Sequence, residues 1–142
     1  MKLIYSPNAE IEFQFTCEPS TVARKAAIDA MRHWSSLAKL VAFAEARHGY
    51  GDSDGFFGII YPSDLDEFDR ANGHSICEGN VEAFAWYGAH EGETHQLPEI
   101  EYLELLRQFL TLMGHPSLAR QIDKLLSEDA KQHNAPDPRF GR

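Results

Sequence analysis

The sequence predicts a single α+β domain in which helices pack on one side of a mainly antiparallel sheet and the chain ends in a helical hairpin. Three observations support this prediction. Residues 10–17 alternate apolar and polar side chains with the period of two expected for a strand that is covered on one face. Residues 20–48 are rich in alanine and follow a helical period. Residues 98–126 contain two further apolar helical segments, separated by Gly114.

The N-terminal third is predicted to contain two strands and a long helical segment. Residues 2–5 form the first strand, a turn follows, and residues 10–17 form the second strand. A single helix over residues 20–48 would be about 43 Å long, whereas a compact domain of this length is only about 37 Å across. We therefore expect a break at residues 33–36, where a serine caps a second helix, and Gly49 as the C′ residue of that helix.

The middle of the chain is predicted to supply the inner strands of the sheet. Residues 50–55 form a loop, and residues 56–61 form a continuous apolar strand. Ser63 then caps a short helix that has Asp66 at its third position and buries Leu65 and Phe68. A hairpin follows, with strands at 81–87 and 93–97, and its small alanine side chains allow one face to pack closely against a helix.

The C-terminal third is predicted to form a helical core. Pro98 takes the first position of a helix whose apolar arc is wide enough to be buried against more than one element. A last helix follows, so that the globular domain spans residues 1–130, and residues 131–142 form a flexible basic tail. The side chains expected in this core are Ile100, Tyr102, Leu103, Leu105, Leu106, Phe109, Leu110, Leu112, Met113, Leu118, Ile122, Leu125 and Leu126.

The formal net charge of −9 is concentrated in the middle of the chain. Residues 51–104 contain thirteen acidic side chains and one basic side chain, Arg70, whereas the flanking stretches carry a slight excess of basic residues. A surface of one sign speeds encounter with a partner of the opposite sign. We therefore expect a cationic protein partner, and no direct contact with nucleic acid, which requires exposed Lys and Arg side chains. The alternative interpretation is an acidic face that only keeps the protein soluble.

Two groups of residues are candidates for binding the partner. The first is a run of four carboxylates at the short helix, which is also compatible with a solvated, capped helix. In the second, two aromatic residues share a strand face with a glutamate, as is common at interfaces, although core packing explains them equally. The nine candidates are Asp64, Asp66, Glu67, Asp69, Glu82, Phe84, Trp86, Glu91 and Glu93.

No motif in the sequence predicts catalysis or a bound cofactor. The chain contains no phosphate-binding loop, no dinucleotide fingerprint and no nucleophile elbow. His90 and His95 do not form the H-E-x-x-H pattern and fall on a predicted turn, while residues 50–55 depart from the calcium-loop consensus. We therefore expect no catalytic residue, metal or cofactor. A metal-dependent enzyme that uses these histidines is kept as an alternative.

The sequence also predicts the compartment. Cys17 and Cys77 match no zinc or redox spacing, and nothing else indicates secretion, so both are expected to be free thiols. The apolar run at the N-terminus is too short for a signal-peptide core, and charged residues interrupt the later apolar runs. We therefore expect a soluble cytoplasmic protein without a membrane segment.

The C-terminal third and the overall character of the chain resemble a known class of proteins. The similarity lies in small size, acidity and the order of three segments: Ala85-Trp86-Tyr87-Gly88, then Leu97-Pro98-Glu99, then residues 101–106 running on to Gly114. In these features the chain resembles bacterial immunity proteins of contact-dependent inhibition and related polymorphic toxin systems. The resemblance implies an inhibitor that binds a cognate toxin domain, often a nuclease, and blocks its active cleft. A small structural or adaptor subunit that binds through the same face is a further alternative.

Overall fold

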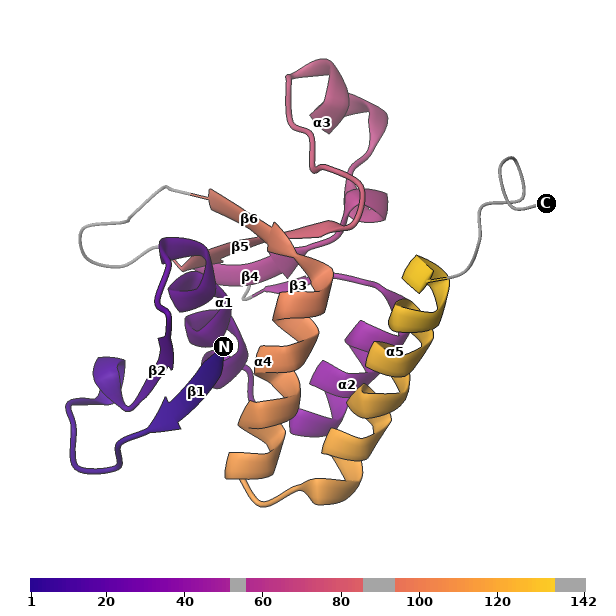
Figure 1. The fold of residues 1–142 in the computed structure, drawn as a ribbon. Helices are drawn as coiled ribbons and strands as arrows, with labels where there is room; N and C mark the ends of the chain where they lie inside the picture. Colours follow the sequence, from indigo (N-terminus) through magenta and orange to yellow (C-terminus); the bar gives the residue numbers. More distant parts are fainter. Residues whose placement is uncertain (52–55, 86–93, 135–142) are drawn as a thin grey trace.

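The protein has the predicted α+β architecture in a computed structural model that describes residues 1–51, 56–85 and 94–134. The strands form two antiparallel sheets, one of β1 and β2 and one in the order β3-β4-β5-β6, and helices α1, α2, α4 and α5 lie together on one side of the larger sheet (Figure 1). The elements are β1 (Lys2–Tyr5), a 3₁₀ turn (Ile11–Phe13), β2 (Phe15–Glu18), α1 (Val22–His33), α2 (Leu37–Ala46), β3 (Tyr50–Gly51), β4 (Phe57–Ile60), a second 3₁₀ turn (Pro62–Asp64), α3 (Glu67–Ala71), β5 (Asn80–Ala85), β6 (Thr94–Pro98), α4 (Glu99–Leu112) and α5 (Pro116–Asn134).

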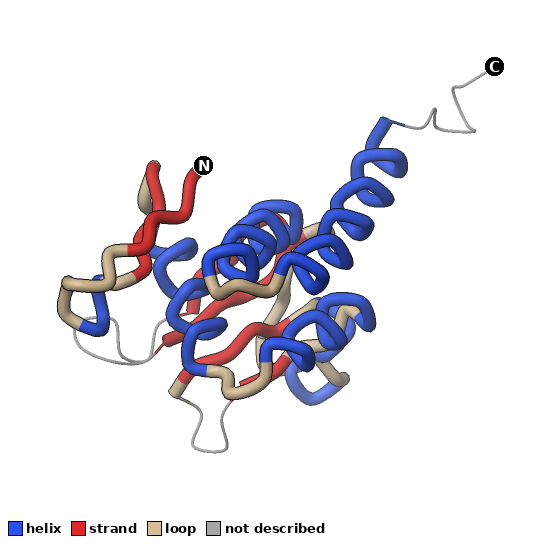
Figure 2. The backbone as a smooth tube through the Cα atoms, turned by 90° about the horizontal axis from the view of Figure 1, so that it is seen from below, coloured by secondary structure: helices blue, strands red, loops and turns tan. Residues whose placement is uncertain are grey.

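Helix α1 packs closely against the inner face of the larger sheet. Val81 and Ala83 of β5 are fully buried, as are Ala27 and Ala30 of α1. Side chains this small on both elements let the helix approach the strands, as the sequence predicts for the alanine-rich hairpin face. The view from below shows the helices crossing this face of the sheet (Figure 2).

The second strand is shorter than the alternating pattern predicts. It pairs with β1 from Tyr5↔Phe15 to Lys2↔Glu18, so the four residues of β1 limit the ladder. Residues 11–13 lie beyond its end and form a 3₁₀ turn, which leaves Ile11 and Phe13 exposed. The prediction of a strand over residues 10–17 is therefore correct only for its second half.

The predicted break in the long helical segment is present, with a different cap at its end. α1 stops at His33, and the Ser36 hydroxyl accepts a hydrogen bond from the Lys39 amide at 3.2 Å at the start of α2. Arg47, and not Gly49, has the left-handed conformation after α2, with φ of 51°. Gly49 is instead required by close packing, because a Cβ there would lie 2.3 Å from the Ile59 carbonyl oxygen. Residues 50 and 51, predicted as loop, form the edge strand β3.

The short helix begins later than predicted. Ser63 lies in a 3₁₀ turn, and α3 is a separate five-residue helix with Asp66 as its N-cap. Leu65 is buried as expected, but Phe68 is 75% exposed. One turn and a half of helix does not form a second row of apolar side chains, so α3 has no face with which to bury this ring.

Helices α4 and α5 form the predicted hairpin, and α4 carries most of its core. Of its expected core side chains, Ile100, Leu112 and Met113 are exposed, while the remainder are buried. Pro98 is the N-cap and Glu99 the first helical residue. Helix α5 continues to Asn134, so the helix extends four residues into the predicted tail, whose remainder lies outside the described residues.

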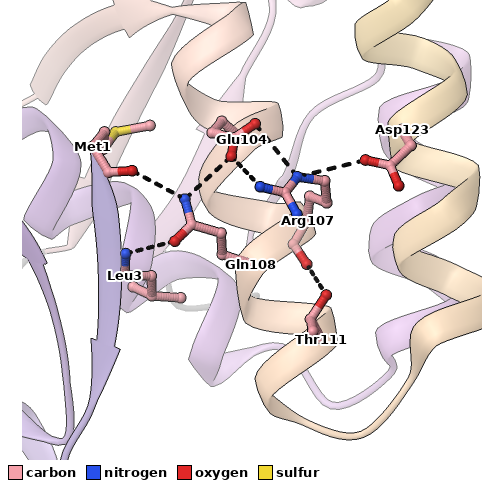
Figure 3. A network of polar contacts seen from close by, with 7 residues as sticks. All are labelled: Met1, Leu3, Glu104, Arg107, Gln108, Thr111 and Asp123. Atoms are coloured by element: carbon pink, nitrogen blue, oxygen red, sulfur yellow. Dashed lines mark hydrogen bonds and ion pairs between the residues drawn. The ribbon is translucent and has the colours of Figure 1, made fainter.

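Polar contacts connect α4 to the elements on both sides (Figure 3). The Gln108 side chain accepts a hydrogen bond from the Leu3 amide at 2.7 Å and donates one to the Met1 carbonyl at 3.3 Å, which ties the start of β1 to α4. On the other side, the Arg107 guanidinium lies 3.5 Å from the Asp123 carboxylate of α5. The N-terminus is thereby fixed to the helical core.

We expect the core of α4 to dominate stability. Leu106 is fully buried and Leu112 is 43% exposed, although both lie on the same helix. Leu106→Ala leaves a cavity and should lower the free energy of unfolding by about 2–5 kcal/mol. Leu112→Ala, the matched control, should lower it by less than about 1 kcal/mol. Chemical denaturation of the two variants measures the difference, and equal effects would contradict this description of the core.

Candidate protein-binding surface

Residues 62–79 form an arm that leaves the sheet after β4 and returns to it at β5 (Figure 1). We call this segment the α3 arm. Its return stretch is fixed on the outer face of the sheet, opposite to α1. The Gln96 side chain of β6 accepts a hydrogen bond from the Cys77 amide at 3.0 Å and donates one to the Ser75 carbonyl at 3.2 Å. The arm is thus anchored at its base and carries α3 away from the body.

Reciprocal capping holds the start of α3. The Asp66 carboxylate accepts a hydrogen bond from the Asp69 amide at 2.8 Å, and the Asp69 carboxylate accepts one from the Asp66 amide at 3.1 Å. The backbone hydrogen bond from Asp69 favours the charged form of Asp66 and lowers the pKa of its carboxyl group. These two carboxylates therefore define the shape of α3 and remain on its surface.

Phe68 lies between these carboxylates in the sequence, with its ring 75% exposed. Its neighbour Glu67 is also exposed, and no ion pair involves Glu67 within the described part of the chain. An exposed aromatic ring on a capped helix combines apolar area with little loss of conformational freedom on binding. The sequence pattern led to the prediction that Phe68 is a core residue. The charged residues on both sides of it were a signal that its side chain is exposed.

Asp64, the first of the four predicted carboxylates, has a structural role. One of its oxygens lies 2.9 Å from His48 Nδ1, and the other accepts hydrogen bonds from the amides of Gly49 at 2.8 Å and Tyr61 at 2.7 Å. The carboxylate therefore joins the segment after α2 to the base of the α3 arm. The Asp64 carboxylate is engaged by these intramolecular contacts and does not belong to the exposed surface around Phe68.

The second predicted group is not an open acidic face. Glu82 is only 4% exposed, and its two carboxylate oxygens lie 2.9 and 3.1 Å from His74 Nε2 in the α3 arm. Phe84 is partly buried on the same sheet face, where its ring lies against Gly58. The expectation that Glu82 presents its charge to a partner is wrong, because the arm folds over it. Trp86, Glu91 and Glu93 lie outside the described residues.

Of the second predicted group, Glu82 lies against His74 of the α3 arm, and Trp86, Glu91 and Glu93 fall outside the described residues. The surface of the arm is therefore described by itself.

Folding neutralises much of the acidic middle of the chain. Glu99 is buried, and Glu101 and Glu104 are partly buried. Each of the three pairs with an arginine, two of which come from the N-terminal third. The pairs are Arg24–Glu101 at 2.8 Å, Arg47–Glu99 at 2.9 Å and Arg107–Glu104. The excess of negative charge in the sequence therefore overstates the acidity of the surface, and Asp66, Glu67, Asp69 and Glu78 of the arm remain the accessible carboxylates of this region among the described residues.

The described residues were also compared with the requirements of other functions. They include no group of three or more His, Cys, Asp or Glu side chains that could hold a metal ion, and His90 of the predicted histidine pair lies outside them. No described helix combines the length and apolar character needed to cross a bilayer. Cys17 is buried, Cys77 is exposed, and both are free thiols as predicted.

Comparison of the chain with protein-family models, with curated proteins and with solved structures finds no match.

Capping by Asp66 predicts a specific pH response of α3. Asp66→Ala removes the acceptor for the Asp69 amide, whose hydrogen exchange should become about fivefold faster, whereas Asp66→Ser should retain most of the protection. The pKa of Asp66 is below its ordinary value of 3.8 in the folded protein. Its contribution is therefore complete above pH 3.8 and is lost as the pH falls through the lower folded value.

Amide exchange of Asp69 measured by NMR between pH 5 and pH 2 tests this behaviour. The wild-type protein should lose protection over the acid end of this range, and Asp66→Ser, which does not titrate at this position, should not show that loss. The same pH profile in both proteins would exclude Asp66 as the titrating cap.

Proposed function

We propose that this protein is an immunity protein, which binds a cognate toxin in the cytoplasm and neutralises it by covering the toxin's active site. The toxin is a basic protein domain, most simply a nuclease. The contact surface on this chain is the α3 arm, with Phe68 as its apolar anchor and Asp66, Glu67 and Asp69 as its charged rim. The exposure of Phe68, 75% on a capped helix, is the observation that carries the proposal.

The physical argument rests on the cost of leaving this ring in water. A phenylalanine side chain contributes about 1.5–3 kcal/mol when it moves from water into an apolar site. The reciprocal caps of α3 already fix the backbone on both sides of the ring. Binding therefore orders few additional groups, and more of the burial energy remains for affinity.

The carboxylates around Phe68 favour a partner with a positively charged surface. A nuclease places Lys and Arg side chains where the phosphates of its substrate bind, and the carboxylates of the arm compete for these groups. Attraction between opposite charges speeds association, while the buried ring determines how slowly the complex dissociates. Inhibition then needs no chemical step on the part of this protein.

This proposal changes the set of residues that the sequence suggested. Asp66, Glu67 and Asp69 are retained, and Phe68 is added. Asp64 and Glu82 are removed because each is engaged within the fold.

Co-purification with the product of the neighbouring gene tests the proposal, using Phe68→Ala for the anchor. Loss of a hot-spot ring should weaken the complex about 30-fold or more. Ile11→Ala is the matched control, because Ile11 is a comparably exposed apolar residue at 72% and lies in the 3₁₀ turn after β1. A complex that tolerates Phe68→Ala as well as Ile11→Ala would remove the arm from the interface. Absence of any complex or protection would overturn the immunity function itself.

The contribution of charge is tested with Glu67→Lys. This side chain is exposed and caps no helix, so the fold should be retained, unlike a reversal at the capping aspartates or at buried Glu82. The association rate should fall at least about tenfold at low salt, and the difference from wild type should shrink as salt increases. Stopped-flow association at two salt concentrations measures both effects. A rate that is independent of this charge would leave the electrostatic part of the mechanism without support.

A further inference from the structure

A cavity of about 430 Å³ lies between the α3 arm and the body of the protein. The arm contributes both its outgoing and its returning stretch, and the body contributes the residue after α2 and the residue after β4. The polar side chains of the lining are Arg47, Tyr61, Ser63, Arg70, Ser75 and Glu78. Two guanidinium groups and three hydroxyl groups therefore line one partly open cavity on a protein with an overall charge of −9.

The Tyr61 hydroxyl is a buried donor that lies close to the Glu99 carboxylate but forms no hydrogen bond of normal geometry with it. Tyr61 is 2% exposed, and among the described residues its hydroxyl forms no hydrogen bond of normal geometry. Burial, reinforced by the nearby Tyr102 and Glu99, raises its pKa well above the ordinary value, so the oxygen keeps its proton. A buried hydroxyl without a well-formed hydrogen bond lowers stability, and a ligand oxygen that accepts the hydrogen removes this cost.

The two arginines provide the complementary charge. Arg70 of α3 forms no ion pair with any described residue. Arg47 holds Glu99 at 2.9 Å through Nη2, and its side chain remains 54% exposed. The left-handed backbone of Arg47, with φ of 51°, is unusual for a residue with a side chain. This conformation ends α2 at Arg47, and the Arg47 side chain lines the cavity.

We propose that this cavity binds a small molecule that carries an oxyanion, either a phosphate or a carboxylate group. Arg70 pairs with the anion, the exposed part of the Arg47 guanidinium supports it, and the Tyr61 hydroxyl donates to one of its oxygens. Glu78 at the same lining accepts from a hydroxyl or amino group elsewhere on the ligand. The ligand then connects the arm to the body. The cavity lies on the side of α3 opposite to Phe68, so it can be filled in the absence of a toxin.

Binding is tested with inorganic phosphate and with acetate, each titrated into the full chain at constant ionic strength maintained with sodium chloride. Isothermal calorimetry and NMR shifts of the arm amides are the two measurements. Saturable binding of either anion is expected, and the anion that binds more tightly identifies the ligand class. Absence of saturable binding by both anions would overturn the proposal.

Three variants assign the site. Arg70→Gln should weaken binding at least tenfold, whereas Arg120→Gln, which removes an exposed arginine on α5, should leave it unchanged. Tyr61→Phe should weaken binding several-fold with little effect on the stability of the free protein, because the hydroxyl has no hydrogen bond of normal geometry to lose. Equal affinity in the two arginine variants would show general attraction of anions and overturn the site, and unchanged affinity in Tyr61→Phe would overturn the assigned donor.

Phe68→Ala separates this inference from the immunity function. It should bind phosphate or acetate as the wild type does, although its complex with the toxin is weakened. Loss of anion binding in Phe68→Ala would contradict the separation of the two sites.

Discussion

The close approach of α1 to the larger sheet is the constraint on which the rest of the structure depends. Small side chains meet on both sides of this contact, with Ala27 and Ala30 facing a strand that carries Ala83. The helix covers the inner face, and α4 packs beside it and carries the C-terminal hairpin (Figure 1). Among the described residues, the α3 arm packs against the outer face of the larger sheet. The helices thus cover the inner face of the sheet, and the α3 arm, which carries the candidate site, lies on the outer face.

Charge pairing decides which carboxylates remain for a partner. Glu99 is buried, and a buried carboxylate is tolerated only with a partner of opposite charge, which Arg47 supplies from the end of α2. On the outer face, Glu82 lies 2.9 Å from His74 Nε2. These contacts join residues far apart in the chain, so a count of charges along the sequence does not describe the charge of the surface. Among the described residues of the acidic middle, the exposed carboxylates that remain are those of the α3 arm.

Periodicity predicted the fold because burial repeats with the geometry of the backbone. The alternation of β5 and the apolar arc of α4 depend only on side-chain spacing. The alternation is confirmed, and so is the arc except for exposed Ile100, Leu112 and Met113, whereas α3 is too short for spacing to distinguish a buried Phe68 from an exposed one. The strand over residues 10–17 was overextended because its length depends on the partner strand. Glu82 was predicted to be at the surface, but the α3 arm covers it. The local sequence around Glu82 does not indicate the path of that arm. The same reason hid the cavity, which is built by residues from four separate parts of the chain, at 47, 61–65, 70 and 75–78.

The α3 arm presents different residues to its two sides. Successive residues of a helix are rotated by about 100°, so Phe68 and Arg70 lie on nearly opposite sides of α3. Phe68 faces solvent, and Arg70 lines the cavity between arm and body. The proposed ligand of Arg70 would therefore act on the same helix that presents Phe68. If the ligand held the arm in the arrangement that binds the proposed partner, it would tighten partner binding, and thermodynamic linkage would require the partner to tighten ligand binding by the same factor. The two sites can thus be distinct in their contacts and still be coupled through one short helix.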